Sequence, residues 1–249
     1  MLVVAGVTLQ ELLRRKVQVN LLLFGLALLL ASSVLSQLTI GHMHRILSDL
    51  GLTAMELIGT LLAVFLGASL VAGDVDRRVV YPVLAKPISR SSYVLGRYAG
   101  LAAALVLNLA VMAAFLAALL ALDAGSLAPV NATLAAAAAA MGVQLLVVGA
   151  VAVLFSCVTT STLASIFALS VTVAGHLTND MRAFWRGADW IATAIWYLVP
   201  NLGALSLNHA VIYGLPVPEG TSAAALYGLL YAGAALALAT LGFERRDLK

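Results

Sequence analysis

Residues 73–100, GDVDRRVVYPVLAKPISRSSYVLGRYAG, form the only long polar stretch of this chain in which positive charge is clustered. The stretch separates two runs of almost uncharged apolar residues, and it holds five of the fourteen basic residues: Arg77, Arg78, Lys86, Arg90 and Arg97. Burying such a cluster in the hydrocarbon of a membrane is very costly, so we expect it in water or at headgroup level. We interpret it as the cytoplasmic platform of a multi-span membrane protein, shaped to dock on another protein.

The composition of the whole chain agrees with a membrane location. Of its 249 residues, 63% are hydrophobic and only 10% are charged, whereas a soluble domain carries about 25% charged residues. The bilayer is therefore expected to be its main solvent. The net charge of +3 favours contact with anionic lipid headgroups over nucleic acid. The single cysteine, Cys157, excludes a disulfide within the chain.

Six segments are long and apolar enough to cross a bilayer, which takes about 20 mainly apolar residues. We predict an all-α membrane protein and a single domain over residues 1–249, with spans at 18–38, 54–73, 99–122, 133–156, 161–178 and 222–242. An even number of spans puts both termini on one side. Three basic residues precede the first span, five lie between the second and third, and three follow the last, against three on the opposite side. The positive-inside rule therefore predicts cytoplasmic termini.

The N-terminal residues 1–17 are predicted to form a short helix lying in the membrane interface. Thr8-Leu9-Gln10-Glu11 has the pattern of a capping box at a helix start. Apolar side chains then recur on one face, which is typical of an interfacial helix. The alternative is the charged start of a signal peptide, but the apolar run 17–38 is longer than a secretory signal requires.

Two connecting segments carry further signals. Lys86 precedes Pro87, which disfavours helix at that point, and Ser89, Ser91 or Ser92 can cap the helix that follows. We therefore expect a helix, a break and a second helix in the loop 74–98, although an ordinary positively charged loop is the alternative. The outer segment 179–221 is rich in tryptophan and proline. It predicts an amphipathic or re-entrant helix at the outer boundary, with a seventh span as the alternative.

Several of these motifs together resemble the permease subunits of ABC-2 type transporters, and most closely the group associated with copper-enzyme maturation. The resemblance rests on Lys86-Pro87, Ser89-Arg90, Gly96-Arg97 with Gly100, the segment 197–202, and the basic tail 244–249. It implies a six-span subunit that dimerises and binds two cytosolic ATPases. It also implies that the N-terminal helix is an elbow helix and that the loop between the second and third spans carries a coupling helix. This chain has Asp76-Arg77-Arg78 where family members often have an acidic residue and a Gly-Thr pair.

On that resemblance, the residues expected to couple the chain to its ATPase are Arg77, Arg78, Val83, Leu84, Lys86, Pro87 and Arg90. The chain has no G-x-x-x-x-G-K-[ST] phosphate loop. We therefore expect no enzyme activity of its own, no catalytic residues and no directly bound cofactor, with ATP and Mg held by the partner ATPase.

Small and polar residues share one face in each of two spans. In the second span they are Glu56, Thr60, Ala63 and Gly67, and in the fifth they are Ser161, Ser165, Thr172 and His176. Such faces permit close helix packing, either within one subunit or at a dimer interface or substrate path. The resemblance favours the interface or path. A catalytic centre inside the membrane would need a pair of histidine or acidic residues at the same depth in neighbouring spans. We expect no such pair, which argues against an intramembrane enzyme.

The first outer loop contains His42, Met43 and His44, whose ring nitrogens and thioether could attract copper. Three ligands on one short loop make an incomplete site, so we predict a solvated loop and no metal centre.

The leading functional hypothesis is the permease subunit of an ATP-driven exporter in the inner membrane of a bacterium or archaeon. It would act as a homodimer with cytosolic ATPases and an extracytoplasmic accessory protein. The alternative is a membrane scaffold that couples an ATPase to an outer partner without moving solute. The sequence leaves the substrate open.

Overall fold

The computed structural model describes residues 1–37, 43–77, 89–184 and 199–245. This part of the chain is helical and contains no strand. Six helices are long and apolar enough to span a membrane, which confirms the predicted fold class. They are α2 (Lys16–Gln37), α3 (Met43–Asp76), α5 (Arg90–Ala124), α6 (Ala132–Val158), α7 (Ser161–Phe184) and α10 (Thr221–Glu244).

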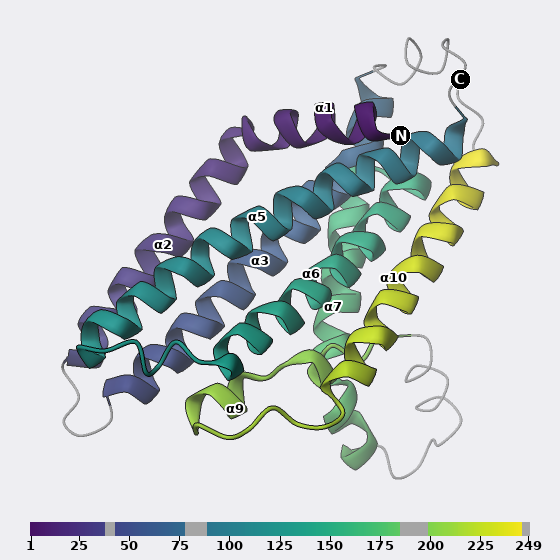
Figure 1. Ribbon diagram of the computed structural model, residues 1–249. Coiled ribbons are helices and arrows are strands. Elements are labelled where there is room, and N and C mark those ends of the chain that lie inside the picture. The colour runs from purple at the N-terminus through teal and green to yellow at the C-terminus, as the bar shows by residue number, and fades with distance from the viewer. Residues whose placement is uncertain (38–42, 78–88, 185–198, 246–249) are drawn as a thin grey trace.

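Three shorter helices complete the described chain: α1 (Leu2–Leu13), the 3-10 helix η1 (Gly203–Leu205) and α9 (Asn208–Ile212). Figure 1 shows α1 turning sharply from α2 and lying over the same end of the bundle as the C-terminal end of α10. At the opposite end, η1 and α9 lie beside the start of α6 and α10. The described ends of the chain therefore share one side, as the even number of spans predicted.

Several helix boundaries differ from the predicted ones. Helices α3 and α5 have 34 and 35 residues, well beyond the predicted 54–73 and 99–122, and α7 continues to Phe184. Charged residues such as Arg45 interrupt the apolar run without interrupting the helix. Met43 and His44 consequently lie in the first turn of α3 rather than in a loop, and His42 is outside the described residues.

Of the two helix N-caps predicted from the sequence, one is confirmed and one is wrong. Ser89 caps α5, accepting a hydrogen bond from the Ser92 backbone nitrogen at 3.2 Å. The predicted capping box at Thr8 is wrong, because α1 already begins at Leu2. The Thr8 hydroxyl instead donates to the Val4 carbonyl within the helix, at 2.8 Å.

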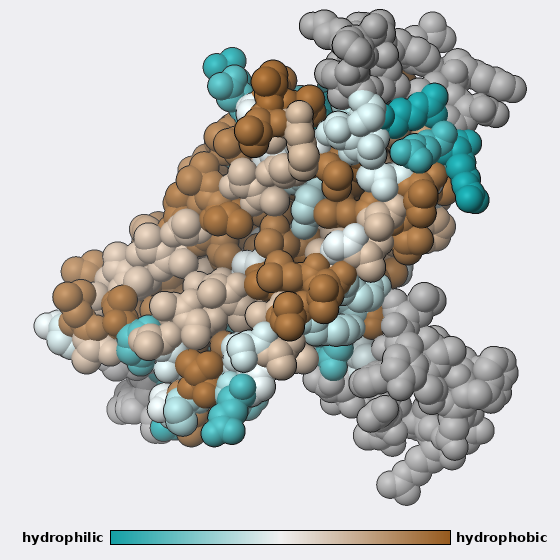
Figure 2. All heavy atoms as spheres, turned by 45° about the vertical axis from the view of Figure 1, so that its right-hand side comes forward, coloured by the Kyte–Doolittle hydropathy of each residue, from teal (hydrophilic) through white to brown (hydrophobic). Residues whose placement is uncertain are grey.

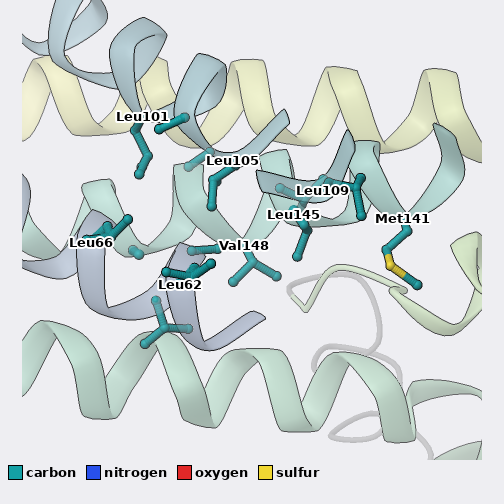
Figure 3. Packing of buried hydrophobic residues seen from close by; sticks show 14 of the residues in the cluster. Leu62, Leu66, Leu101, Leu105, Leu109, Met141, Leu145 and Val148 are labelled. Carbon is teal, nitrogen blue, oxygen red and sulfur yellow. The ribbon is translucent and has the colours of Figure 1, made fainter. Parts of the chain in front are cut away.

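The centre of the bundle is formed by α3 and α6. In their most apolar stretches 72% and 67% of residues are buried, whereas the other four spans bury between 22% and 33%. Figure 3 shows the leucines that α3, α5 and α6 contribute to this core, among them Leu62, Leu101 and Leu145. The peripheral spans leave large apolar side chains exposed, and Figure 2 shows apolar surface across the middle of the visible face. That surface suits contact with lipid tails.

Two features hold α3 against α6. A Cβ added at Gly67 would lie 2.8 Å from the Ala152 Cβ, so the backbones approach more closely than a larger residue allows. The Ser156 hydroxyl donates to the Ala68 carbonyl at 2.7 Å and accepts from the Ala72 nitrogen at 2.9 Å. Close approach and hydrogen bonding are what drive helix association in a membrane, where lipid tails already solvate apolar side chains.

Gly67→Leu is expected to force α3 and α6 apart and to lower stability by about 1–3 kcal/mol, the usual cost of overpacking. Thermal unfolding of the purified protein in lipid nanodiscs measures the effect. Gly233→Leu is the matched control, because nothing lies within 4 Å of a Cβ added at Gly233. Equal unfolding temperatures for the two variants would contradict this account of the α3–α6 contact.

Candidate functional site

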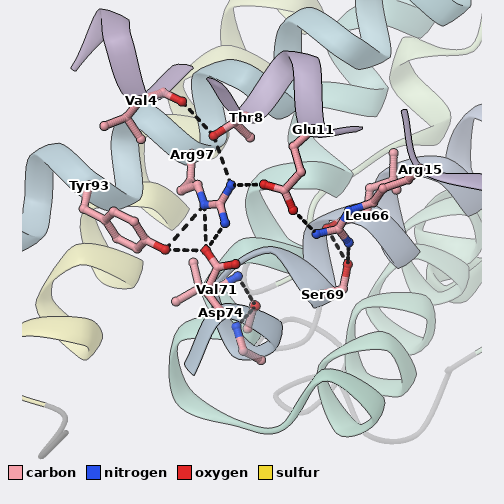
Figure 4. A network of polar contacts seen from close by, with 12 residues as sticks. Val4, Thr8, Glu11, Arg15, Leu66, Ser69, Val71, Asp74, Tyr93 and Arg97 are labelled. Atoms are coloured by element: carbon pink, nitrogen blue, oxygen red, sulfur yellow. Dashed lines mark hydrogen bonds and ion pairs between the residues drawn. The ribbon is translucent and has the colours of Figure 1, made fainter. Parts of the chain in front are cut away.

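Polar side chains gather in two clusters inside the bundle. The first, called here the Arg97 cluster, lies where α1 crosses α3 and α5 and contains Thr8, Glu11, Arg15, Ser69, Asp74, Tyr93 and Arg97 (Figure 4). The second, the Glu56 cluster, lies toward α9 and contains Glu56, Gln144, His176 and Asn208.

Arg97 is the centre of the first cluster. Its Nε donates to Asp74 Oδ2 at 2.7 Å, and its Nη2 forms a second contact with the same carboxylate. Its Nη1 donates to Glu11 Oε2 at 2.7 Å and to the Thr8 hydroxyl at 3.2 Å. One guanidinium therefore joins α1, α3 and α5. Only 7% of the Arg97 side chain is exposed, so Arg97 is buried between these helices and not presented to open water. Its expected location at headgroup level stays a prediction.

Other members extend the Arg97 cluster to neighbouring elements. The Tyr93 hydroxyl donates to Asp74, and the Tyr93 ring stacks on Phe243 of α10 with 6.0 Å between centroids. Arg15, between α1 and α2, pairs with Glu11 at 2.6 Å and donates to the Ser69 hydroxyl at 3.1 Å. Two cations and two carboxylates thus offset each other, as buried charges require.

Glu11 belongs to α1, outside the spans. Burial raises the pKa of the Glu11 carboxyl, but hydrogen bonds from Arg15 and Arg97 outweigh this and hold the pKa below its usual value. Because the folded-state pKa is lowered, the stabilisation by this carboxylate is present above the unfolded-state pKa. It is lost as the pH falls through the folded-state pKa.

Close packing accompanies these charges. A Cβ added at Gly100 of α5 would lie 2.5 Å from the Thr8 Cβ and 2.7 Å from the Ala5 carbonyl oxygen of α1. Glycine at this position lets α1 lie directly against α5, which brings Thr8 and Glu11 within reach of Arg97.

The predicted coupling residues lie beside this cluster or outside the described chain. Arg77 follows α3 and is exposed. Arg90 begins α5, and its Nη1 donates to the carbonyls of Phe243 and Glu244 at 3.3 and 3.0 Å, which satisfies acceptors at the C-terminal end of α10. Arg78, Val83, Leu84, Lys86 and Pro87 lie outside the described residues.

The Glu56 cluster joins four helices. Glu56 Oε1 on α3 accepts from Gln144 Nε2 on α6 at 2.9 Å and lies 2.9 Å from His176 Nε2 on α7. Glu56 Oε2 accepts from Asn208 Nδ2 on α9 at 3.0 Å. The expectation that no acidic residue and histidine share a depth in the spans is therefore wrong. Glu56 lies 13 residues into α3, because the helix begins at Met43 and not near residue 54.

The predicted polar faces of α3 and α7 turn toward other helices of the same chain. Thr60, Ala63 and Gly67 are buried on α3. On α7, Thr172 is buried, and Ser161, Ser165 and His176 are partly buried. These residues pack within the subunit in this structure, and their role in a dimer interface or a path stays a prediction.

Sequence reasoning missed the buried contacts of Asp74, Arg97 and Gln144, and the contact that partly buried Asn208 makes with Glu56. A weak signal existed for two of them. Gln144 interrupts the apolar middle of α6, and Asp74 stands at the end of the apolar run of α3. A polar group in an apolar helix must find a partner, which suggests a contact without naming that partner.

Comparison with known families gives one match. The model of the family described as "ABC-2 family transporter protein" matches residues 10–248, nearly the whole chain. No curated protein matches the chain. The finer assignment to the copper-enzyme maturation group stays a prediction.

Arg97→Met is expected to cost about 3–5 kcal/mol of stability, because it leaves the Asp74 carboxylate buried without its cation. The double variant Asp74→Asn/Arg97→Met removes both charges and should recover part of that loss. Unfolding of each variant in nanodiscs provides the measurement, with exposed Arg245→Met as the matched control. A single variant as stable as the control would show that the ion pair contributes nothing.

Proposed function

Because this chain belongs to the ABC-2 family of transporter proteins, we propose that it is the permease subunit of an ABC exporter driven by separate cytosolic ATPases. In this proposal two copies form the translocation path, and ATP with Mg is bound by the partner ATPases. The permease supplies the path and the surface on which the ATPases act.

The observation that carries the proposal is the anchoring of both helices that flank residues 78–88. On one side, Asp74 lies near the end of α3 and is held by Arg97 and Tyr93. On the other side, Arg90 at the start of α5 is bonded to the end of α10. A displacement of the segment between these helices would therefore move α3 and α5 together with α1 and α10. That is the mechanical property required of a coupling loop.

The distribution of basic residues supports an orientation with both termini in the cytoplasm. Arg14, Lys16, Arg77 and Arg245 are all exposed at the end of the bundle that holds α1. Positively charged residues favour the cytoplasmic side. We therefore place α1, residues 78–88 and both termini in the cytoplasm of a bacterium or archaeon, with α9 on the outer side of the inner membrane.

In the proposed cycle, α3 and α7 are the helices that open the path. Their polar faces contact each other through Glu56 and His176. Separation of the two helices would expose hydroxyl, amide and carboxylate groups to a passing solute. Those groups suit a mildly polar or cationic substrate.

A second candidate function is a scaffold that links an ATPase to an outer protein without transport. The surface that would hold such an outer protein is formed by Tyr213, Leu215 and Val217, whose side chains are exposed beside α9. An accessory protein docked there is compatible with either function, and movement of solute decides between them.

Arg77→Glu/Arg78→Glu is expected to reduce ATPase stimulation and transport by about tenfold, since charge reversal at a docking surface opposes association with the partner. The measurement uses the permease copurified with its ATPase and reconstituted in vesicles. Arg245→Glu is the matched control, because Arg245 is exposed at the same end but lies outside the segment between α3 and α5. Wild-type ATPase activity and transport in the double variant would refute the coupling assignment, and ATP hydrolysis without transport by the wild type would favour the scaffold.

A further inference from the structure

A groove lies between α7 and α10, and α6 forms its floor. In the described residues, α6 packs along both of these helices, whereas α7 and α10 make almost no contact with each other (Figure 1). The resulting hollow has a volume of about 360 Å³. Val151 of α6 is buried at its floor, and Val171 of α7 and Tyr231 of α10 stand on its two walls. The bundle therefore leaves a space between two of its spans that its own described side chains do not fill.

The segment that precedes η1 closes the groove at one end. The Leu202 backbone nitrogen donates to the Gly175 carbonyl of α7 at 3.2 Å. The Asn201 backbone nitrogen donates to the Tyr227 hydroxyl of α10 at 3.3 Å. Backbone held to both walls therefore separates the groove from the end of the bundle that carries α9.

The groove opens sideways, at the depth of the lipid tails. Its α10 wall runs from Tyr231 to Leu238, in the interior of a 24-residue span. Ala234 and Leu238 are exposed at the mouth of the groove. Leu230 and Leu241, which flank this wall on the same helix, are also exposed. The mouth is thus continuous with the apolar surface that suits contact with lipid tails.

The lining decides which ligand chemistry fits. Of the nine described residues that line the groove, only Tyr231 has a polar side-chain group and none is charged. A headgroup, a sugar or a peptide backbone would lose hydrogen bonds there, which is costly. A hydrocarbon chain loses none, and it restores the dispersion contacts that the lining of an empty space lacks. The groove therefore matches the tail of a lipid.

A second copy of this chain fits the groove less well. A stable interface between proteins takes about 20–30 residues from each partner, whereas nine described residues line the groove. A lipid tail needs no more surface than the groove itself offers, and lipid tails surround its mouth.

We propose that this groove binds one acyl chain of a membrane lipid, which takes the place of a direct contact between α7 and α10. The bound chain lies against Val171, next to Thr172 on the polar face of α7. It therefore supports a helix whose polar face contacts α3 through His176 and Glu56. This binding requires only that the helices span a membrane, so its test is independent of any ATPase partner.

The experiment places the full chain in phosphatidylcholine nanodiscs that contain a small fraction of phosphatidylcholine with a diazirine on one acyl chain. Illumination attaches the chain to nearby residues, which peptide mass spectrometry identifies. Leu238 in the groove and Leu23 on α2 are compared, because both are 58% exposed. They also lie at similar depth, six residues before Glu244 and seven after Lys16. Leu238 should be labelled about tenfold more strongly, as expected for a held chain against passing lipid.

Ala234→Phe tests the groove itself. Ala234 is exposed at the mouth, so the phenyl ring enters the groove without displacing a core residue. It should lower the labelling of Leu238 about tenfold, because a chain forced into a filled site meets the cost of overpacking. Ala237→Phe is the matched control, since Ala237 is exposed on the same helix but does not line the groove. This control should be labelled as the wild type is.

Three results would overturn the proposal. Equal labelling of Leu238 and Leu23 in the wild type would show that the groove holds no particular chain. Wild-type labelling of Leu238 in Ala234→Phe would place the label outside the groove. A groove without label, together with crosslinks between α10 helices of two copies, would assign it to a second copy of this chain.

Discussion

The ion pair between Arg97 and Asp74 is the interaction on which the arrangement of this chain depends. In a protein whose main solvent is lipid, a buried guanidinium must find its partners within the bundle. Arg97 finds them on α1 and α3, and so helps to fix the short helix α1 across the ends of the spans. The same pair sets the geometry of the helices that enter and leave residues 78–88.

Helix α3 connects the two polar clusters. It carries Glu56 near one side and Asp74 near the other, 18 residues or about 27 Å apart along a straight helix. It is also the most buried span, held to α6 by close backbone packing and by Ser156. A rigid element with polar contacts at both ends can transmit displacement between them. The Arg97 cluster and the Glu56 cluster thus belong to one mechanical unit.

The number and position of the spans could be predicted because composition and length alone decide them. The ends of α3 could not, since Arg45 and Asp49 break the apolar run while the helix continues past them. The role of Arg97 was missed for a different reason. Counting charges treats each arginine as solvated, whereas the partners of Arg97 lie 23 and 86 residues away in sequence. Glu56 and His176 were both named from the sequence as residues of a path or dimer interface, which stays a prediction. Their contact with each other depends on packing that no local pattern encodes.

The length of α3 and α5 has a further consequence. Helices of 34 and 35 residues extend about 50 Å, whereas the hydrocarbon layer is about 30 Å thick. Both helices must therefore be strongly tilted or protrude well past the lipid tails. Tilt is the common response when a helix is longer than the hydrocarbon layer is thick. A change in bilayer thickness would therefore alter their inclination and shift their tips sideways. The lipid composition of the host membrane thereby becomes a parameter of how this protein works.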